Sequence, residues 1–264
     1  MKSWIKGKLS LIYLFWALII LIFGLLLIEQ TKYVQPTSYY AEQIQAAQLM
    51  KSSLEAIKEE RLKRAVPLDV GLDPNQTGII GEEYTQLTTT LGNLEAKRTS
   101  SNPAFAALLV KYFKEANLKK GDAVAIGASG SFPGLILATL SAAKALGLEP
   151  LLIYSVGSSE YGANIPEFTF VPMLDSLNKG NIFPYHLLAI SMGGYLDQAR
   201  GMFYPDSREI IEKIAKESDA LFINTENIEE NIKQRMRLYK KAAADRPIKA
   251  FVNIGGATPN YGDT

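Results

Sequence analysis

The chain has 264 residues, of which 47% are hydrophobic and 21% charged, so it can bury the core of one or two domains. Its net charge is +1, and without Lys2, Lys6 and Lys8 there remain 25 basic and 27 acidic residues. No long basic run favours nucleic-acid binding. The lack of cysteine excludes disulfides, thiol catalysis and thiolate metal sites.

Residues 1–32 are predicted to form a cytoplasmic tip and a transmembrane anchor. Residues 9–28 are uncharged and almost entirely apolar, and about 20 residues at 1.5 Å each span a hydrocarbon core of roughly 30 Å. The alternative is a cleaved signal peptide, but the apolar run exceeds the usual length of roughly 7–15 residues and no small-x-small pattern follows it. Three lysines precede the span and one follows it closely, so we expect the N-terminus in the cytoplasm and the body outside.

Residues 33–66 are predicted to form a linker and an amphipathic helix. From residue 39 to residue 64 the charges fall largely on one side, and apolar residues recur on the other at helical spacing, namely Tyr40, Ile44, Ala47, Leu54 and Ile57. This pattern is typical of a stalk or of a helix that covers a domain. A partner-binding helix near the membrane is the alternative.

The first part of the remaining segment is rich in turn residues. Asp69, Asp73 and Asn75 have a spacing like that of a calcium loop, but the alternating oxygens and the final glutamate are missing, so turn chemistry explains them and we predict no metal site. The polar, threonine-rich residues 81–101 are predicted to be a surface loop. The alternative is that they line a site beside the turn at Gly127.

Residues 67–264 are predicted to form an α/β domain with a largely parallel sheet and flanking helices, because apolar strand-like runs alternate with helical patterns. The predicted strands are residues 123–126, 151–156, 187–191, 220–224 and 249–254. The predicted helices are residues 104–116, 133–145, 168–178, 210–216 and 228–244, with a further helix from about Tyr195. Ser131 is expected to cap the helix that begins near Pro133, and Gly147 to end it. Because no helix follows the last strand, we also expect a C-terminal truncation.

The glycine-serine turn at residues 127–131 is the main candidate site, because backbone N–H groups and the following helix N-terminus favour anions there. Its spacing matches neither a Walker A loop, nor a dinucleotide fingerprint, nor a GxSxG nucleophile elbow. Carboxylate or phosphate binding, a plain turn and a nucleophilic serine all remain open. A second glycine-serine stretch follows the next strand, where parallel sheets bind ligands. The predicted ligand-binding residues are therefore Gly127, Ser129, Gly130, Ser131, Gly157, Ser158 and Ser159.

Catalytic candidates are few in this sequence. Ser129 and Ser131 are the candidate nucleophiles, and any Ser-His-acid triad must use His186, the only histidine. Glu160, Asp175 and Asp197 could act as general acids or bases, although spacing singles out none of them. No cofactor is indicated.

Three segments carry a resemblance to a known family: TGIIGEEYTQLTTTLGNLEAKRTSSNPAFAALLV, AVAIGASGSFPGLILATLSAAKALGL and IYSVGSSEYGAN. The chain resembles, from its N-terminal anchor to its end, the bacterial poly-γ-glutamate system protein family. This resemblance implies an accessory role in the synthesis or export of an anionic γ-linked polymer. The implied partners are the cytoplasmic membrane, other poly-γ-glutamate synthesis and export proteins, and the polymer itself. Family members are expected to run further, to a second membrane segment, and no catalytic residue is carried over from them.

Two alternatives to a polymer-binding accessory protein stay open. One is a γ-glutamyl amide hydrolase or transferase that uses Ser129 or Ser131 as nucleophile and His186 as base. The other is a scaffold subunit without catalytic activity.

Overall fold

The computed structural model describes residues 10–31, 35–244 and 246–261, and the chain divides into two units, Met1–Ser38 and Tyr39–Thr264. In the first unit, helix α1 (Leu11–Thr31) has no buried residue. It is long and apolar enough to cross a membrane, which fits either a single-pass anchor or a signal sequence.

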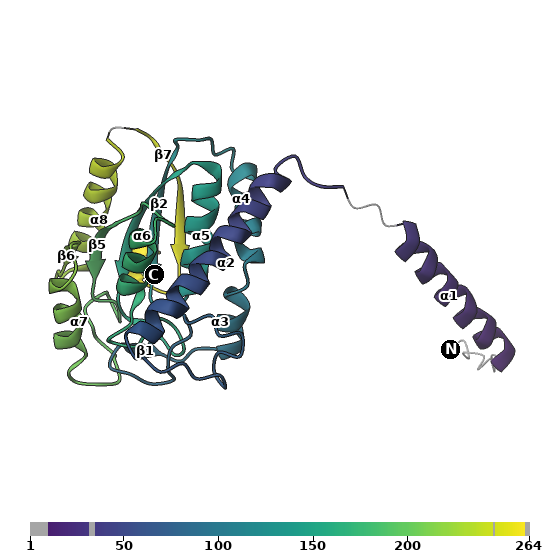
Figure 1. Cartoon of the computed structure of the whole chain (residues 1–264), viewed down its shortest axis with the longest axis horizontal. Helices are drawn as coiled ribbons and strands as arrows, with labels where there is room; N and C mark the ends of the chain where they lie inside the picture. Colours follow the sequence, from purple (N-terminus) through teal and green to yellow (C-terminus); the bar gives the residue numbers. More distant parts are fainter. Residues whose placement is uncertain (1–9, 32–34, 245, 262–264) are drawn as a thin grey trace, which may run out of the picture. The chain divides into compact units, whose positions relative to one another are not determined.

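The second unit is built on a five-stranded parallel sheet with the strand order β6-β5-β3-β2-β7 (Figure 1). The strands are β2 (Ala123–Ser129), β3 (Glu149–Ser155), β5 (Leu187–Ser191), β6 (Leu221–Ile223) and β7 (Ile248–Ile254). All seven residues of β2 are buried, as expected for a central strand covered on both faces. The predicted α/β fold with a parallel sheet is therefore confirmed.

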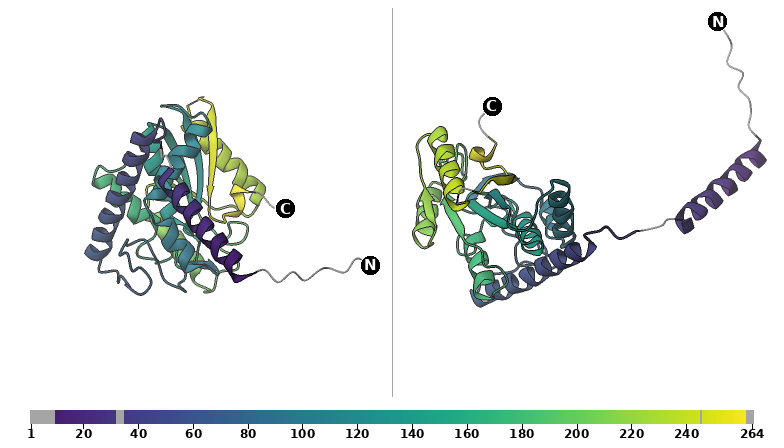
Figure 2. Two further views of the ribbon diagram at one scale, coloured as in Figure 1. Left: turned by 90° about the vertical axis from the view of Figure 1, so that its right-hand side faces the viewer. Right: turned by 90° about the horizontal axis from the view of Figure 1, so that it is seen from above.

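Alternate residues of the strands supply the two halves of the core. Val124, Ile126 and Ala128 belong to the larger apolar cluster, together with α5 (Pro133–Leu146), α6 (Phe170–Lys179) and α7 (Ser207–Lys216). Ala123 and Ala125 belong to a smaller cluster with α8 (Ile228–Ala242) on the opposite face (Figure 2).

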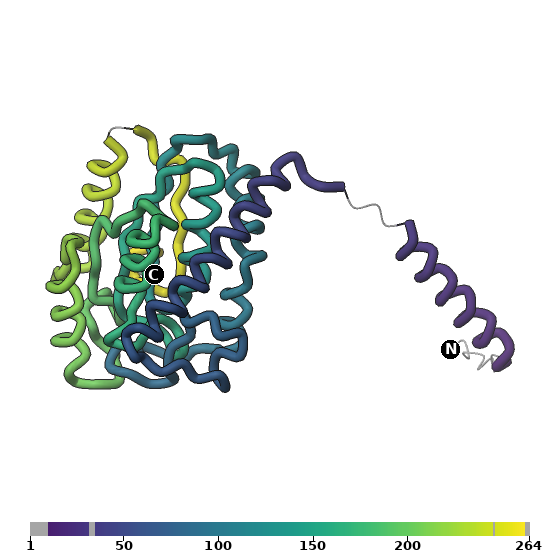
Figure 3. Tube along the Cα trace, in the orientation of Figure 1, coloured from purple at the N-terminus to yellow at the C-terminus, as the bar shows by residue number. Residues whose placement is uncertain are grey.

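The helices change faces because the chain reverses direction in the sheet. From β2 it steps outward through β3 and β5 to β6, and then crosses back to place β7 on the other side of β2. Right-handed crossovers put the helices of the outward steps on one face and the returning helix on the other. Figure 3 shows the C-terminal strand β7 beside the much earlier β2, with which it pairs from Ala123 to Ala128. The switch point of the sheet therefore lies between these two strands.

Helix α2 (Tyr40–Lys63) packs against α5, α6 and α4 (Ala104–Glu115), so it belongs to the same unit as the sheet and is not a separate stalk. The predicted apolar face is only partly right, because Tyr40 and Ile44 are exposed. The buried positions run instead along Ala46, Met50, Ser53, Leu54, Ile57 and Arg61.

Buried Arg61 fixes the loop that follows α2. Its guanidinium donates to the carbonyl oxygens of Pro67, Gly78 and Ile80 at 2.5–3.0 Å. Nearby, Asp73 accepts hydrogen bonds from the Thr77 hydroxyl and the Gly78 N–H. These contacts are turn chemistry, and they satisfy backbone groups that a buried loop would otherwise leave unpaired.

Two predictions about irregular segments are wrong. The threonine-rich segment at residues 81–101 contains strand β1 (Thr88–Thr90) and helix α3 (Leu94–Ser100), so it is not simply a loop. No helix begins at Tyr195, because residues 193–206 form consecutive turns in which Leu196, Asp197 and Ala199 have positive φ angles. Helix geometry excludes such angles. Helix α7 begins only at Ser207.

A small parallel sheet lies beyond the end of β3. Strand β1 pairs with β4 (Ser158–Ser159), and the Glu160 N–H donates to the carbonyl oxygen of Thr90. A short 3-10 helix, η1 (Thr258–Asn260), follows β7. Both elements are added at the C-terminal edge of the main sheet.

Candidate functional site

A cleft of about 700 Å³ lies at the C-terminal edge of the sheet. Its lining comes from the segments that follow β2, β3, β5 and β7, and from β1. Ligands bind at this position in open α/β sheets, where the strand order reverses. The cleft thus combines loops that are distant in sequence but converge because parallel strands end at the same edge.

Glycines let these loops approach one another closely. Gly193 has a φ of 77°, and a Cβ there would lie 2.5 Å from the backbone nitrogen of Gly157. A Cβ on Gly157 would likewise lie 2.9 Å from the nitrogen of Gly194. Real Cβ atoms do not come so near to backbone, so any side chain at these positions would force the β3 and β5 loops apart.

The threonine-rich segment forms one wall of the cleft. Thr89 and Thr90 line it, and the Thr89 hydroxyl donates to the carbonyl oxygen of Ser158 at 3.1 Å. Asn164 anchors the same segment through its amide, which donates to the Glu82 carbonyl at 2.7 Å and the Thr88 hydroxyl at 3.1 Å. The segment therefore lies beside the turn at Gly127, as the alternative prediction had it.

The predicted ligand-binding residues divide into two groups. Ser129, Ser131, Gly157 and Ser159 line the cleft. Gly127, Gly130 and Ser158 do not line it. Gly127 lies within β2, directly beneath the Asn260 side chain, and Gly130 packs against the β3–β4 connection. These glycines therefore permit close packing behind the cleft.

Ser131 does not cap α5, as its position had led us to expect. The helix begins after Phe132 without a side-chain cap. The Ser131 hydroxyl instead accepts a hydrogen bond from the Ser159 N–H at 3.0 Å. Gly147 does end the helix, in the left-handed conformation predicted for it.

The structure does not bring His186 together with either candidate serine. His186 directly precedes β5, and with Asp175 it lines a separate hollow of about 330 Å³. Ser129 ends β2 at the opposite edge of the sheet, at the level of Ser191 two strands away. Five residues at about 3.3 Å each separate these levels, which puts His186 far beyond hydrogen-bond reach of the serines.

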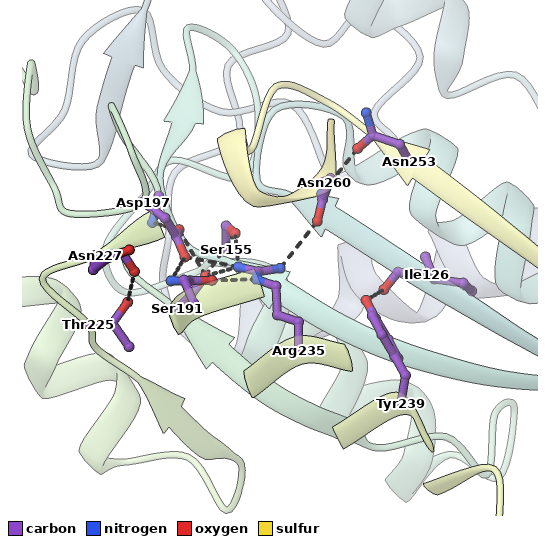
Figure 4. A network of polar contacts seen from close by, with 12 residues as sticks. Ile126, Ser155, Ser191, Asp197, Thr225, Asn227, Arg235, Tyr239, Asn253 and Asn260 are labelled. Atoms are coloured by element: carbon purple, nitrogen blue, oxygen red, sulfur yellow. Dashed lines mark hydrogen bonds and ion pairs between the residues drawn. The ribbon is translucent and has the colours of Figure 1, made fainter. Parts of the chain in front are cut away.

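Buried Arg235 organises a polar network behind the cleft (Figure 4). Its guanidinium contacts Asp197 at 2.9 Å, Ser191 at 2.6 Å and Ser155 at 3.1 Å. Asp197 also accepts hydrogen bonds from Ser191, Asn231 and the Gly193 N–H. All four of these contacts of the Asp197 carboxylate are with other residues of the protein, so Asp197 holds the β5 loop in place. The carboxylate does not face the cleft as a general acid or base.

Lys97 of α3 is a buried residue behind the cleft that sequence analysis did not single out. It is 2% exposed, and its ammonium donates to the Ser131 carbonyl and to the Ser159 hydroxyl, the latter at 2.6 Å. The Phe132 ring covers it, with the ring centroid 3.9 Å from Nζ. Burial lowers the pKa of Lys97 to about 8, against the opposing field of the Glu160 carboxylate.

The chemistry of the lining favours an anion over a cation. Of the described residues that line the cleft, none is acidic and Arg200 is the charged one. Hydroxyls and glycine backbone supply most of the polar groups, including those of Thr90, Ser129 and Gly256. Protein sites for divalent cations are usually built around carboxylate or imidazole ligands, which the described residues of this lining do not present.

No family model matches the chain, and no match is found among curated proteins or solved structures. The resemblance to the poly-γ-glutamate system family therefore stays a prediction from the sequence.

Replacing Arg235 should destabilise the protein strongly. In Arg235→Met the buried Asp197 carboxylate loses its cation, so we expect the free energy of unfolding to fall by about 3–5 kcal/mol. Arg237→Met removes an arginine two residues away whose pair with Glu230 is largely exposed, so its loss of stability should be much smaller. Urea unfolding of the full chain in detergent, followed by circular dichroism, compares the two variants. Equal losses would contradict the role given to Arg235.

Lys97 should make stability depend on pH in the alkaline range. Its pKa is about 8 in the folded chain, below the ordinary 10.5, so between these values the unfolded chain binds more protons. The stability of the wild type relative to Lys97→Met should therefore rise from about pH 8 to about pH 10, by at most about 1.4 kcal/mol per pH unit. Other titrating groups cancel in this difference. Lys111→Met, which removes a half-exposed lysine, should give a flat difference in the same urea titrations.

Proposed function

We propose that this chain is a membrane-anchored accessory protein whose cleft binds a carboxylate-bearing ligand. The observation that carries the proposal is the composition of the cleft: glycine loops and hydroxyls at the switch point of the sheet, with a single charged side chain, Arg200, among the described residues that line it. Hydroxyl groups and an arginine fork are among the groups that proteins use to hold carboxylates.

Arg200 is available to a ligand. Its side chain is exposed, and within the part of the chain that the structure describes it has no ion-pair partner. Its backbone carbonyl accepts a hydrogen bond from the Tyr195 N–H at 2.9 Å, which fixes the base of the side chain. A carboxylate in the cleft would therefore meet a cation that no internal acid neutralises.

The ligand we propose is a γ-linked glutamate chain. The sequence resemblance points to poly-γ-glutamate synthesis or export, and such a polymer carries one carboxylate on every residue. The body of the protein is close to neutral, so binding would depend on local contacts in the cleft and not on a general attraction of a polyanion. Other proteins of poly-γ-glutamate synthesis and export are the proposed partners.

The proposed location is the outer side of the cytoplasmic membrane. Helix α1 supplies the span, and the proposal takes it as an uncleaved anchor. Lys2, Lys6 and Lys8 precede it, an asymmetry that favours a cytoplasmic N-terminus. The cleft would then face the compartment into which the polymer is exported.

Protease accessibility tests this orientation. In intact bacterial spheroplasts, protease added from outside should degrade the unit Tyr39–Thr264 and leave a membrane-bound N-terminal fragment. A cytoplasmic marker protein should stay intact, which controls for lysis. Protection of this unit until the membrane is permeabilised would overturn the proposed orientation, and its release from washed membranes without protease would overturn the uncleaved anchor.

Binding of a defined oligomer tests the ligand. The full chain in lipid nanodiscs should bind a γ-linked glutamate oligomer in calorimetric titrations, and Arg200→Gln should weaken this binding about 5- to 10-fold because a charge-assisted hydrogen bond is lost. Arg237→Gln removes an exposed arginine outside the cleft and should leave the affinity unchanged. Absence of binding, or equal weakening by both substitutions, would overturn the proposal.

A further inference from the structure

Lys97 and Ser159 form a buried contact that opens onto the cleft. Lys97 Nζ lies 2.6 Å from Ser159 Oγ, and Ser159 is one of the residues that line the cleft. The two side chains are 2% and 6% exposed. A hydroxyl at the surface of the cleft is thus joined to an amine enclosed behind it, and the two atoms are within the distance that proton transfer requires.

The direct partners of Lys97 differ from those of Arg235. Buried cations are ordinarily paired with carboxylates, as Arg235 is with Asp197. Lys97 forms no ion pair with any described residue, and its direct contacts are the neutral oxygens of Ser131 and Ser159 and the Phe132 ring. Glu160, whose charge reaches Lys97, uses its carboxylate to accept a hydrogen bond from the Gly92 N–H at 2.7 Å.

This environment increases the fraction of neutral amine, which is the form that accepts a proton. Water is excluded by Phe132 and by the packing of α3 against α5, which approach so closely at Gly134 that a Cβ there would lie 2.5 Å from the Ser100 carbonyl oxygen. A pKa of about 8 leaves a useful fraction of Lys97 unprotonated at neutral pH. An adjacent general base activates a serine hydroxyl, and a lysine is the base in the Ser-Lys variants of the catalytic triad.

We propose that Ser159 is a nucleophile and Lys97 its general base, and that together they cleave or transfer an acyl group of a carboxylate-bearing amide or ester bound in the cleft. The choice of substrate class rests on the proposed function, whereas the nucleophile–base pair rests on the geometry alone. Neither residue belongs to the pair of Ser129 or Ser131 with His186 that sequence analysis left open as an alternative.

In the proposed hydrolysis, water is the second substrate. Ser159 Oγ attacks the acyl carbon while its proton passes to Lys97 Nζ, and the C–N or C–O bond to the leaving group breaks as the leaving amine or alcohol takes that proton. An ester between the acyl group and Ser159 remains. Water then attacks this ester, Lys97 takes a proton from the water, and the ester bond breaks with return of the proton to Ser159 Oγ. An amine acceptor in place of water gives transfer.

Ser131 positions both members of the pair. Its carbonyl oxygen accepts from Lys97, and its hydroxyl accepts from the Ser159 N–H at 3.0 Å. Ser129 has a different role, because its hydroxyl accepts from the Ser131 N–H at 3.4 Å and packs beneath Gly255. The nucleophile is therefore predicted two residues beyond Gly157 and not in the first glycine-serine turn.

Labelling with a fluorophosphonate tests the pair without knowledge of the substrate. The full chain in nanodiscs should form an adduct on Ser159, located by peptide mass spectrometry, and Ser159→Ala should abolish it. Lys97→Arg keeps the positive charge but cannot act as a base at neutral pH, so it should slow labelling at least about 100-fold. Ser176→Ala and Lys111→Arg change a serine and a lysine outside the cleft and should label as the wild type does.

A pH profile of the wild type adds a measurement that needs no variant. The labelling rate should rise with pH to a plateau, with a midpoint near 8, as Lys97 loses its proton in the field of Glu160. Circular dichroism at each pH and for each variant monitors folding. No adduct on Ser159, an unchanged rate in folded Lys97→Arg, or a flat pH profile would overturn the proposal.

Adding the γ-linked oligomer separates this proposal from the proposed ligand. An adduct on Ser159 in a protein that binds no oligomer would uphold the nucleophile–base pair and overturn the ligand. Oligomer binding without an adduct on Ser159 would uphold the ligand and overturn the nucleophile–base pair. Where both hold, the oligomer should slow labelling by occupying the cleft.

Discussion

The close approach of the backbone at the ends of β3 and β5 is the constraint on which the cleft depends. Gly157 and Gly193 meet where a Cβ would lie 2.5 Å from a backbone nitrogen, so the two loops can lie side by side only as glycines. The Asp197 carboxylate then holds the Gly193 N–H at 2.6 Å, and Arg235 neutralises that carboxylate from behind. The floor of the cleft is therefore backbone, held rigid by a buried ion pair that does not itself line the cleft.

Two buried cations, Arg235 and Lys97, lie at this edge of the sheet and differ in their partners. Arg235 has its full set of charged and polar partners, so its charge is compensated and its geometry fixed. Lys97 contacts neutral oxygens and an aromatic ring, so burial lowers its pKa. A lysine suits the second position, because an arginine would stay charged under the same desolvation. The difference in partners fixes the charge of Arg235, whereas burial lowers the pKa of Lys97.

The sheet could be predicted from the sequence because its strands are continuous apolar runs between turn residues, and such runs are characteristic of buried parallel strands. The site could be predicted only in part. Ser129, Ser131, Gly157 and Ser159 follow strands, so topology alone brings them to one edge. Lys97 lies in a polar seven-residue helix whose charges look solvated, and only tertiary packing buries it. The false helix at Tyr195 has a similar cause, because the turns there are held by Asp197 contacts to Asn231 and Arg235, distant residues that no local pattern reveals.

The positions of Arg200 and Ser159 fit the chemistry of the proposed polymer. Arg200 comes from the segment after β5 and Ser159 from the segment after β3, and these strands are hydrogen-bonded neighbours about 4.8 Å apart. In a γ-linked glutamate chain the carbon that carries the free carboxylate is bonded directly to the amide nitrogen. A carboxylate held by Arg200 would therefore have an amide nitrogen only one carbon away from it. An α-linked chain places its side-chain carboxylate three carbons from the backbone amide nitrogen, so the two linkages differ in the distance between the carboxylate and the amide.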